Sequence, residues 1–136
     1  MRVWTRREQT TIRDVTNRSI LVVDDDPAIR DLVADALKDE GYQVETASNG
    51  AEAVEVVEHG RPSLVLLDMR MPVLDGWGFA QVMRDRGVRL PIVVMTAAEN
   101  AQHWCDEIGG ECALPKPFDL DQLFTTVARL VRAGAS

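Results

Sequence analysis

The chain has 136 residues, of which 46% are hydrophobic and 27% charged, and its formal net charge is −7. This length and composition suit one globular domain with a single hydrophobic core. The negative charge argues against a general affinity for nucleic acid. No apolar run approaches the roughly 18 residues of a membrane span, and the first residues lack the apolar stretch of a secretory signal. We therefore expect a cytoplasmic protein that contacts neither nucleic acid nor membrane, with Cys105 and Cys112 reduced.

The first 18 residues differ in charge from the remainder of the chain. They contain five arginines and two acidic residues, a net charge of +3, so the remainder carries −10. They are polar and show no hydrophobic periodicity. We interpret residues 1–18 as a flexible basic arm and residues 19–136 as the folded domain.

From Ser19 onward, short apolar runs alternate with amphipathic segments. The first run, Ile20–Val23, is typical of a strand buried on both faces. Asp26 and Pro27 then mark the start of a helix, as N-cap and first-turn residue. The same reading along the chain predicts strands over residues 20–23, 43–47, 64–67, 90–95 and 111–114, and helices over residues 27–40, 51–58, 76–85, 99–108 and 119–132.

Five strands that alternate with five helices indicate an α/β fold with a doubly wound, five-stranded parallel sheet flanked by helices. The connection Arg70–Gly76 is too long and too rich in Pro and Gly for a simple turn, so we expect a shaped loop. Asp75 at its end is expected to cap the following helix.

Acidic residues follow two of the predicted strands. Asp24, Asp25 and Asp26 come directly after the first strand, and Asp68 ends the third. The C-terminal ends of parallel strands meet at one edge of the sheet, where ligands bind in open α/β folds. Carboxylates that converge there repel one another by ~4 kcal/mol per pair at about 4 Å, so we expect a cation between them. Oxygen ligands suit a hard divalent cation such as Mg²⁺, whereas Asp26 fits a helix cap better than a ligand.

Two further polar side chains, Thr96 and Lys116, lie at the ends of the fourth and fifth strands. A hydroxyl and an ammonium are groups that a phosphoryl oxygen would bond. A carboxylate held against Mg²⁺ can act as a nucleophile toward phosphorus and form an aspartyl phosphate. Catalysis of phosphoryl transfer consists largely of positioning and charge neutralisation, so this set of groups points to phosphoryl chemistry.

The fragments LVVDDDP, LVLLDMRMPVLDG, VVMTA and LPKPF occur in this order, and together they resemble the receiver domain of two-component response regulators. The match covers residues 19–133. The resemblance implies the flavodoxin-like receiver fold, and transfer of a phosphoryl group to Asp68 from a sensor histidine kinase or a phosphotransfer protein. It also implies signalling through altered contacts with an unknown downstream protein. Such a domain is not an enzyme with an external substrate, because it catalyses only its own phosphorylation and dephosphorylation. Since few residues follow the last helix, we expect a stand-alone, single-domain regulator.

The resemblance also assigns the Mg²⁺ ligands. Asp25, the phosphorylated Asp68 and the main-chain carbonyl of Arg70 would contact the ion directly. Asp24 would contact it through a water molecule.

Two residues are assigned to the phosphoryl group in the same way. Thr96 would bond one phosphoryl oxygen and Lys116 would pair with another. The Lys116–Pro117 peptide bond is expected to be cis, as in other receivers.

The sequence departs from the family pattern at Ala113. Receivers usually carry Tyr or Phe three residues before the lysine, and the burial of that ring changes when the threonine is drawn toward the phosphoryl group. The stretch between Thr96 and Lys116 also looks short, which predicts a trimmed or distorted helix there. We therefore expect activation to be transmitted by the loop and helix that follow Thr96.

Two alternative functions compete with phosphorylation-dependent signalling. Ala113 favours an interaction module of the same fold that works without phosphorylation. A Mg²⁺-dependent phosphohydrolase with an aspartyl nucleophile usually needs a second acid two residues after that nucleophile. Arg70 occupies this position, which argues against a phosphohydrolase.

Overall fold

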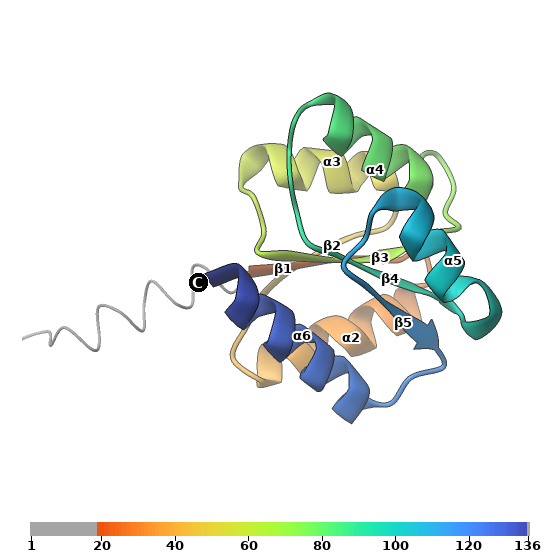
Figure 1. Cartoon of the computed structure of the whole chain (residues 1–136). Helices are drawn as coiled ribbons and strands as arrows, with labels where there is room; N and C mark the ends of the chain where they lie inside the picture. The colour runs from red at the N-terminus through yellow and green to blue at the C-terminus, as the bar shows by residue number, and fades with distance from the viewer. Residues whose placement is uncertain (1–18, 136) are drawn as a thin grey trace, which may run out of the picture.

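The structure is a computed structural model that describes residues 19–135, so the basic arm expected over residues 1–18 lies outside the described residues. The described chain forms one five-stranded parallel sheet in the order β2-β1-β3-β4-β5, with helices on both sides (Figure 1). The doubly wound α/β fold expected from the sequence is therefore confirmed. The elements are β1 (Ser19–Val23), α2 (Pro27–Asp39), β2 (Gln43–Ala47), α3 (Gly50–His59), β3 (Leu64–Asp68), α4 (Gly76–Asp85), β4 (Ile92–Ala97), α5 (Ala98–Ile108), β5 (Cys112–Lys116) and α6 (Leu120–Ala135).

The sheet separates two hydrophobic cores. Helices α2 and α6 cover one face, and α3, α4 and α5 cover the other (Figure 1). Side chains of β1 alternate between them: Leu21 and Val23 pack with α3, α4 and α5, whereas Ile20 and Val22 pack with α2 and α6. Because both faces are covered, the central strands need apolar residues at every position, which explains their uninterrupted apolar runs. None of the described helices has the length and apolar character that a membrane crossing requires.

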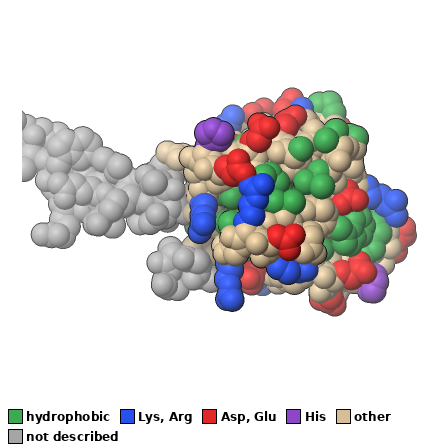
Figure 2. Space-filling view, turned by 90° about the horizontal axis from the view of Figure 1, so that it is seen from above, with side chains coloured by type: hydrophobic (Ala, Val, Ile, Leu, Met, Phe, Trp, Pro, Cys, Tyr) green, Lys and Arg blue, Asp and Glu red, His purple; other side chains and the backbone are tan. Residues whose placement is uncertain are grey.

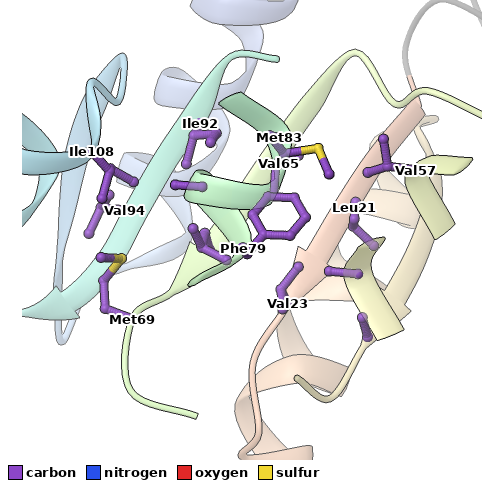
Figure 3. Close-up of a cluster of buried hydrophobic side chains, with 14 of the residues drawn as sticks. Leu21, Val23, Val57, Val65, Met69, Phe79, Met83, Ile92, Val94 and Ile108 are labelled. Carbon is purple, nitrogen blue, oxygen red and sulfur yellow. The ribbon is translucent and has the colours of Figure 1, made fainter. Parts of the chain in front are cut away.

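Phe79 anchors α4 to the sheet. Its ring is fully buried and lies among Leu21, Val23 and Val65 of the central strands, with Met83 of the same helix beside it (Figure 3). Burying a side chain of this size stabilises the fold by about 1.5–3 kcal/mol. This packing fixes the helix that follows the loop after Asp68.

Side-chain caps begin α2 and α4, as predicted. The carboxylate of Asp26 accepts hydrogen bonds from the main-chain N–H groups of Ala28 (2.9 Å) and Ile29 (3.4 Å). The carboxylate of Asp75 accepts from the N–H of Gly78 at 2.8 Å. Asp26 is thereby engaged in a cap, which agrees with its exclusion from the acidic pocket.

The structure differs from the sequence-based expectations around β4 and β5. β4 begins at Ile92 rather than Leu90, and β5 continues through Pro115 to Lys116. A proline is tolerated there because β5 is an edge strand of the sheet. The helix expected to be trimmed or distorted is α5, which runs without a break over 11 residues, and no loop residue separates it from β4.

Candidate functional site

Three carboxylates meet at the C-terminal edge of the sheet. Asp24 and Asp25 follow β1, and Asp68 ends the neighbouring strand β3. Each of the three offers an oxygen, and these oxygens all lie within 4.8 Å of one another. Asp24 is fully buried and Asp68 is 8% exposed, whereas Asp25 is open to solvent. The predicted convergence of these acids is therefore present.

Lys116 enters the same site from the far edge of the sheet. Its ammonium Nζ lies 2.9 Å from Oδ2 of Asp24 and 3.8 Å from Oδ1 of Asp68. The Lys116–Pro117 peptide bond is cis. Thr96, from β4 between the two strands, is buried, one residue beyond the position paired with Asp68. Lys116 thus joins the three acids, and Thr96 lies at the same edge of the sheet, at the end of the strand between β3 and β5.

Asp24 and Asp68 differ in how their oxygens are used. One oxygen of Asp24 accepts from the N–H of Asp26 at 3.0 Å, and the other accepts from Lys116. Asp68 is farther from the lysine and retains some solvent access. Burial and the neighbouring charge of Asp24 raise the pKa of Asp68 to about 7, although Lys116 opposes the rise. The Asp68 carboxylate is therefore under-compensated by the protein's own cations.

The loop after Asp68 is held tightly against the strand end. The N–H of Gly76 donates to the carbonyl of Met69 at 2.9 Å. A Cβ atom at Gly76 would lie only 2.8 Å from Cα of Met69 and 3.0 Å from the carbonyl oxygen of Asp68. Only glycine allows this approach. The Met69 carbonyl is thus occupied, whereas the next carbonyl, that of Arg70, accepts no main-chain hydrogen bond within the described chain.

The middle of this loop is strained. Val73 has φ +69°, a value that β-branched residues rarely adopt, and its side chain is 82% exposed. The N–H of Leu74 donates to the carbonyl of Pro72 at 2.7 Å, which closes a three-residue turn around Val73. The carbonyl of Leu74 in turn accepts from the N–H of Gly50 at 2.7 Å. The sequence predicted a shaped loop, but not these contacts.

The donor set fits a hard divalent cation. The clustered carboxylates supply oxygen atoms only, and the Arg70 carbonyl, which accepts no main-chain hydrogen bond from residues 19–135, follows Asp68 by two residues. Mg²⁺ prefers such oxygen ligands and usually retains several waters. A divalent ion would also offset the repulsion that raises the Asp68 pKa.

Comparison with known proteins identifies the family. The family model described as "Response regulator receiver domain" matches residues 20–128. The chain belongs to this family. Over 115 residues the receiver domain is 40% identical to the response regulator MprA of Mycobacterium sp. (strain KMS), and equally to MprA of Mycobacterium leprae. These alignments cover 83% of this chain and 50% of the relatives, so the chain spans about half the length of the curated relatives it matches.

Solved receiver domains have the same architecture. The receiver domain of NtrX from Brucella abortus superposes with a TM-score of 0.77 at 32% identity, covering 83% of this chain and 98% of the NtrX chain. The chemotaxis protein CheY4 of Vibrio cholerae gives a TM-score of 0.74 at 32% identity, covering 82% and 97%. The resemblance and the receiver fold stated from the sequence are both confirmed.

Proposed function

We propose that Asp68 accepts a phosphoryl group from the phosphohistidine of a sensor histidine kinase or phosphotransfer protein, and that the domain signals through altered contacts with a downstream protein. The observation that carries the proposal is the difference between the clustered acids. Both oxygens of Asp24 are engaged and buried, whereas Asp68 keeps solvent access next to Lys116. Of the two buried acids, Asp68 is therefore the one with a nucleophilic oxygen available.

In the transfer, a carboxylate oxygen of Asp68 bonds to phosphorus while the P–N bond of the phosphohistidine breaks. The electron pair of that bond stays on the imidazole nitrogen, which takes up a proton from solvent. Lys116, 3.8 Å from Asp68, is placed to move from Asp24 toward a phosphoryl oxygen. The Thr96 hydroxyl supplies a neutral donor to another oxygen. The protein itself positions the groups and offsets charge, as expected for this reaction class.

Asp25, Asp68 and the Arg70 carbonyl would hold Mg²⁺ directly, with Asp24 contacting it through water because both Asp24 oxygens already accept hydrogen bonds. When bound, the ion supplies positive charge to the carboxylates and to the incoming phosphoryl oxygens. The reaction is therefore proposed to be Mg²⁺-dependent. The domain acts on itself alone and not on an external substrate.

The test is incubation with acetyl phosphate, with Mg²⁺ or with EDTA, followed by intact-mass measurement. We expect the mass increase of one phosphoryl group only with Mg²⁺, its loss in Asp68→Asn, and its retention in the control Asp39→Asn. Asp39 is an exposed acid at the end of α2. An adduct that persists in Asp68→Asn, or no adduct in the unaltered protein, contradicts the proposal.

One observation favours a second candidate function. β5 carries Ala113, half-buried and paired with Val94, where receivers usually carry an aromatic ring. An interaction module that works without phosphorylation would not need that ring. In the same experiment, such a module would form no adduct with or without Mg²⁺.

A further inference from the structure

A chain of side-chain contacts leads from the loop after Asp68 to the surface of α4 and α5. The guanidinium carbon of Arg70 lies 5.0 Å from the ring centroid of Trp104 on α5. The Trp104 ring meets the Trp77 ring of α4 at 4.8 Å between centroids, with an angle of 66° between the planes. The indole N–H of Trp77 donates to the carboxylate of Glu107 at 3.2 Å. These four residues, Arg70, Trp77, Trp104 and Glu107, are called the tryptophan cluster below.

The tryptophan cluster lies at the surface. Arg70 is exposed, and both indole rings are half-buried. Figure 2, which looks onto the side covered by α3 and α4, shows hydrophobic side chains at the end where α5 lies, bordered by charged ones. Tryptophan and arginine are the residue types that dominate binding energy at protein interfaces. The position of Arg70 over Trp104 therefore decides whether the face of this indole is open to a partner protein.

Arg70 is also close to the phosphoryl acceptor. It follows Asp68 by two residues, a span of at most about 7 Å along the backbone. Its side chain can therefore lie on Trp104 or turn toward a group attached to Asp68, but it cannot do both. Lys116 approaches Asp68 from β5.

The two contacts open to the Arg70 side chain differ in free energy. A guanidinium over an exposed indole favours this contact over the solvated side chain by about two- to fivefold in its equilibrium constant. A charge-assisted hydrogen bond to a doubly charged phosphoryl group favours that contact over the solvated side chain by about tenfold or more in its equilibrium constant. Phosphorylation therefore shifts the balance toward Asp68, whereas in its absence the ring of Trp104 is the better partner.

We propose that Arg70 is a phosphoryl-binding side chain that rests on Trp104 in the unphosphorylated domain, and that its transfer to the phosphoryl group on Asp68 uncovers the face of Trp104. The exposed indole changes the surface of α4 and α5 that a partner protein meets. This inference rests on the proposed phosphorylation of Asp68. It gives an aromatic side chain that reports phosphorylation to a domain in which Ala113 of β5 stands where receivers usually carry an aromatic ring.

The first test is the affinity of the Mg²⁺-loaded protein for beryllofluoride, which mimics an aspartyl phosphate. Arg70→Gln keeps the main-chain carbonyl and is expected to weaken binding about tenfold. Trp104→Leu removes the competing partner of Arg70 and is expected to strengthen binding about two- to fivefold. The opposite signs separate this role from a general loss of structure. The control Arg132→Gln, an exposed change on α6 across the sheet, leaves the affinity unchanged.

The second test is acrylamide quenching of tryptophan emission in a Trp4→Phe background, which removes the tryptophan outside the described residues. Phosphorylation is expected to increase quenching, and Arg70→Gln is expected to abolish the difference between the two states. Unchanged affinity in Arg70→Gln, weaker binding in Trp104→Leu, or equal quenching in both states overturns the inference.

Intact mass, measured on the same samples, separates the two proposals. A phosphoryl adduct without an Arg70 effect removes only the present inference. Failure of the unaltered protein to form the adduct removes both.

Discussion

Replacing Asp68 with Asn is expected to stabilise the metal-free domain at neutral and alkaline pH. The side chain sits against Asp24 in a buried pocket, and its pKa is raised from 3.8 to about 7. The folded state therefore holds the Asp68 proton more tightly than the unfolded state does. As pH rises above about 4, the unfolded chain loses this proton first, so the free energy of unfolding falls until about pH 7 and then levels off.

The size of the gain in unfolding free energy follows from the rise in the Asp68 pKa. A rise of about three pKa units corresponds to at most about 4 kcal/mol, since each unit is worth about 1.4 kcal/mol. Asn has the shape of the carboxyl group but cannot ionise. Asp68→Asn should therefore exceed the unaltered protein in stability by up to about 4 kcal/mol above pH 7, and the difference should vanish near pH 4.

Urea unfolding in EDTA, followed by circular dichroism at several pH values, measures this difference. Asp39→Asn serves as the control, because an exposed substitution on α2 should change stability by less than about 0.5 kcal/mol. Adding Mg²⁺ at about 100 times its dissociation constant should stabilise the unaltered protein by about 2.7 kcal/mol and the Asn variant by much less. Equal stability of the two proteins above pH 7, or a less stable Asn variant, would refute the reasoning.

Three further predictions, two of them with a second substitution for comparison, test the loop and the ion pair by urea unfolding. Gly76→Ala should cost about 1–3 kcal/mol, because its Cβ would press on the backbone at the end of β3. Gly60→Ala, with no atom within 4 Å of its Cβ, should be nearly neutral, and equal losses at both glycines would contradict the packing argument. Val73→Gly should gain about 1 kcal/mol, because φ +69° is strained for valine and its side chain is exposed, so a loss would disprove the strain. Lys116→Met should cost about 3 kcal/mol by leaving the buried Asp24 carboxylate without a cation. Adding Asp24→Asn should recover most of that cost, and additive losses would show that the pair is not coupled.

The fold was predictable where local pattern and tertiary environment agree. The apolar runs of β1 and β3 are buried on both faces of the sheet. An uninterrupted apolar run is the pattern expected of such a central strand, so the sequence alone predicts its place. The end of β5 was not predictable in the same way. Pro115 interrupts a strand unless the strand is at an edge, and the edge position depends on the order of all five strands.

Part of the site was predictable from the sequence for the same reason, and part was not. That Asp24, Asp68 and Lys116 converge follows from their places at the ends of parallel strands. That Lys116 lies nearer to Asp24 than to Asp68 depends on the three-dimensional path of β5 and has no local signal. The contacts of Trp104 have no local signal either, because its neighbours Arg70 and Trp77 come from segments about 30 residues away.

The central claim is that Asp68, rather than Asp24 or Asp25, receives the phosphoryl group. Three carboxylates within 4.8 Å of one another make the position of the adduct the decisive quantity. After incubation with acetyl phosphate and Mg²⁺, borohydride reduction converts an aspartyl phosphate into homoserine, which peptide mass spectrometry locates. The account predicts homoserine at position 68 alone. Homoserine at position 24 or 25, or at none of the three, would contradict it.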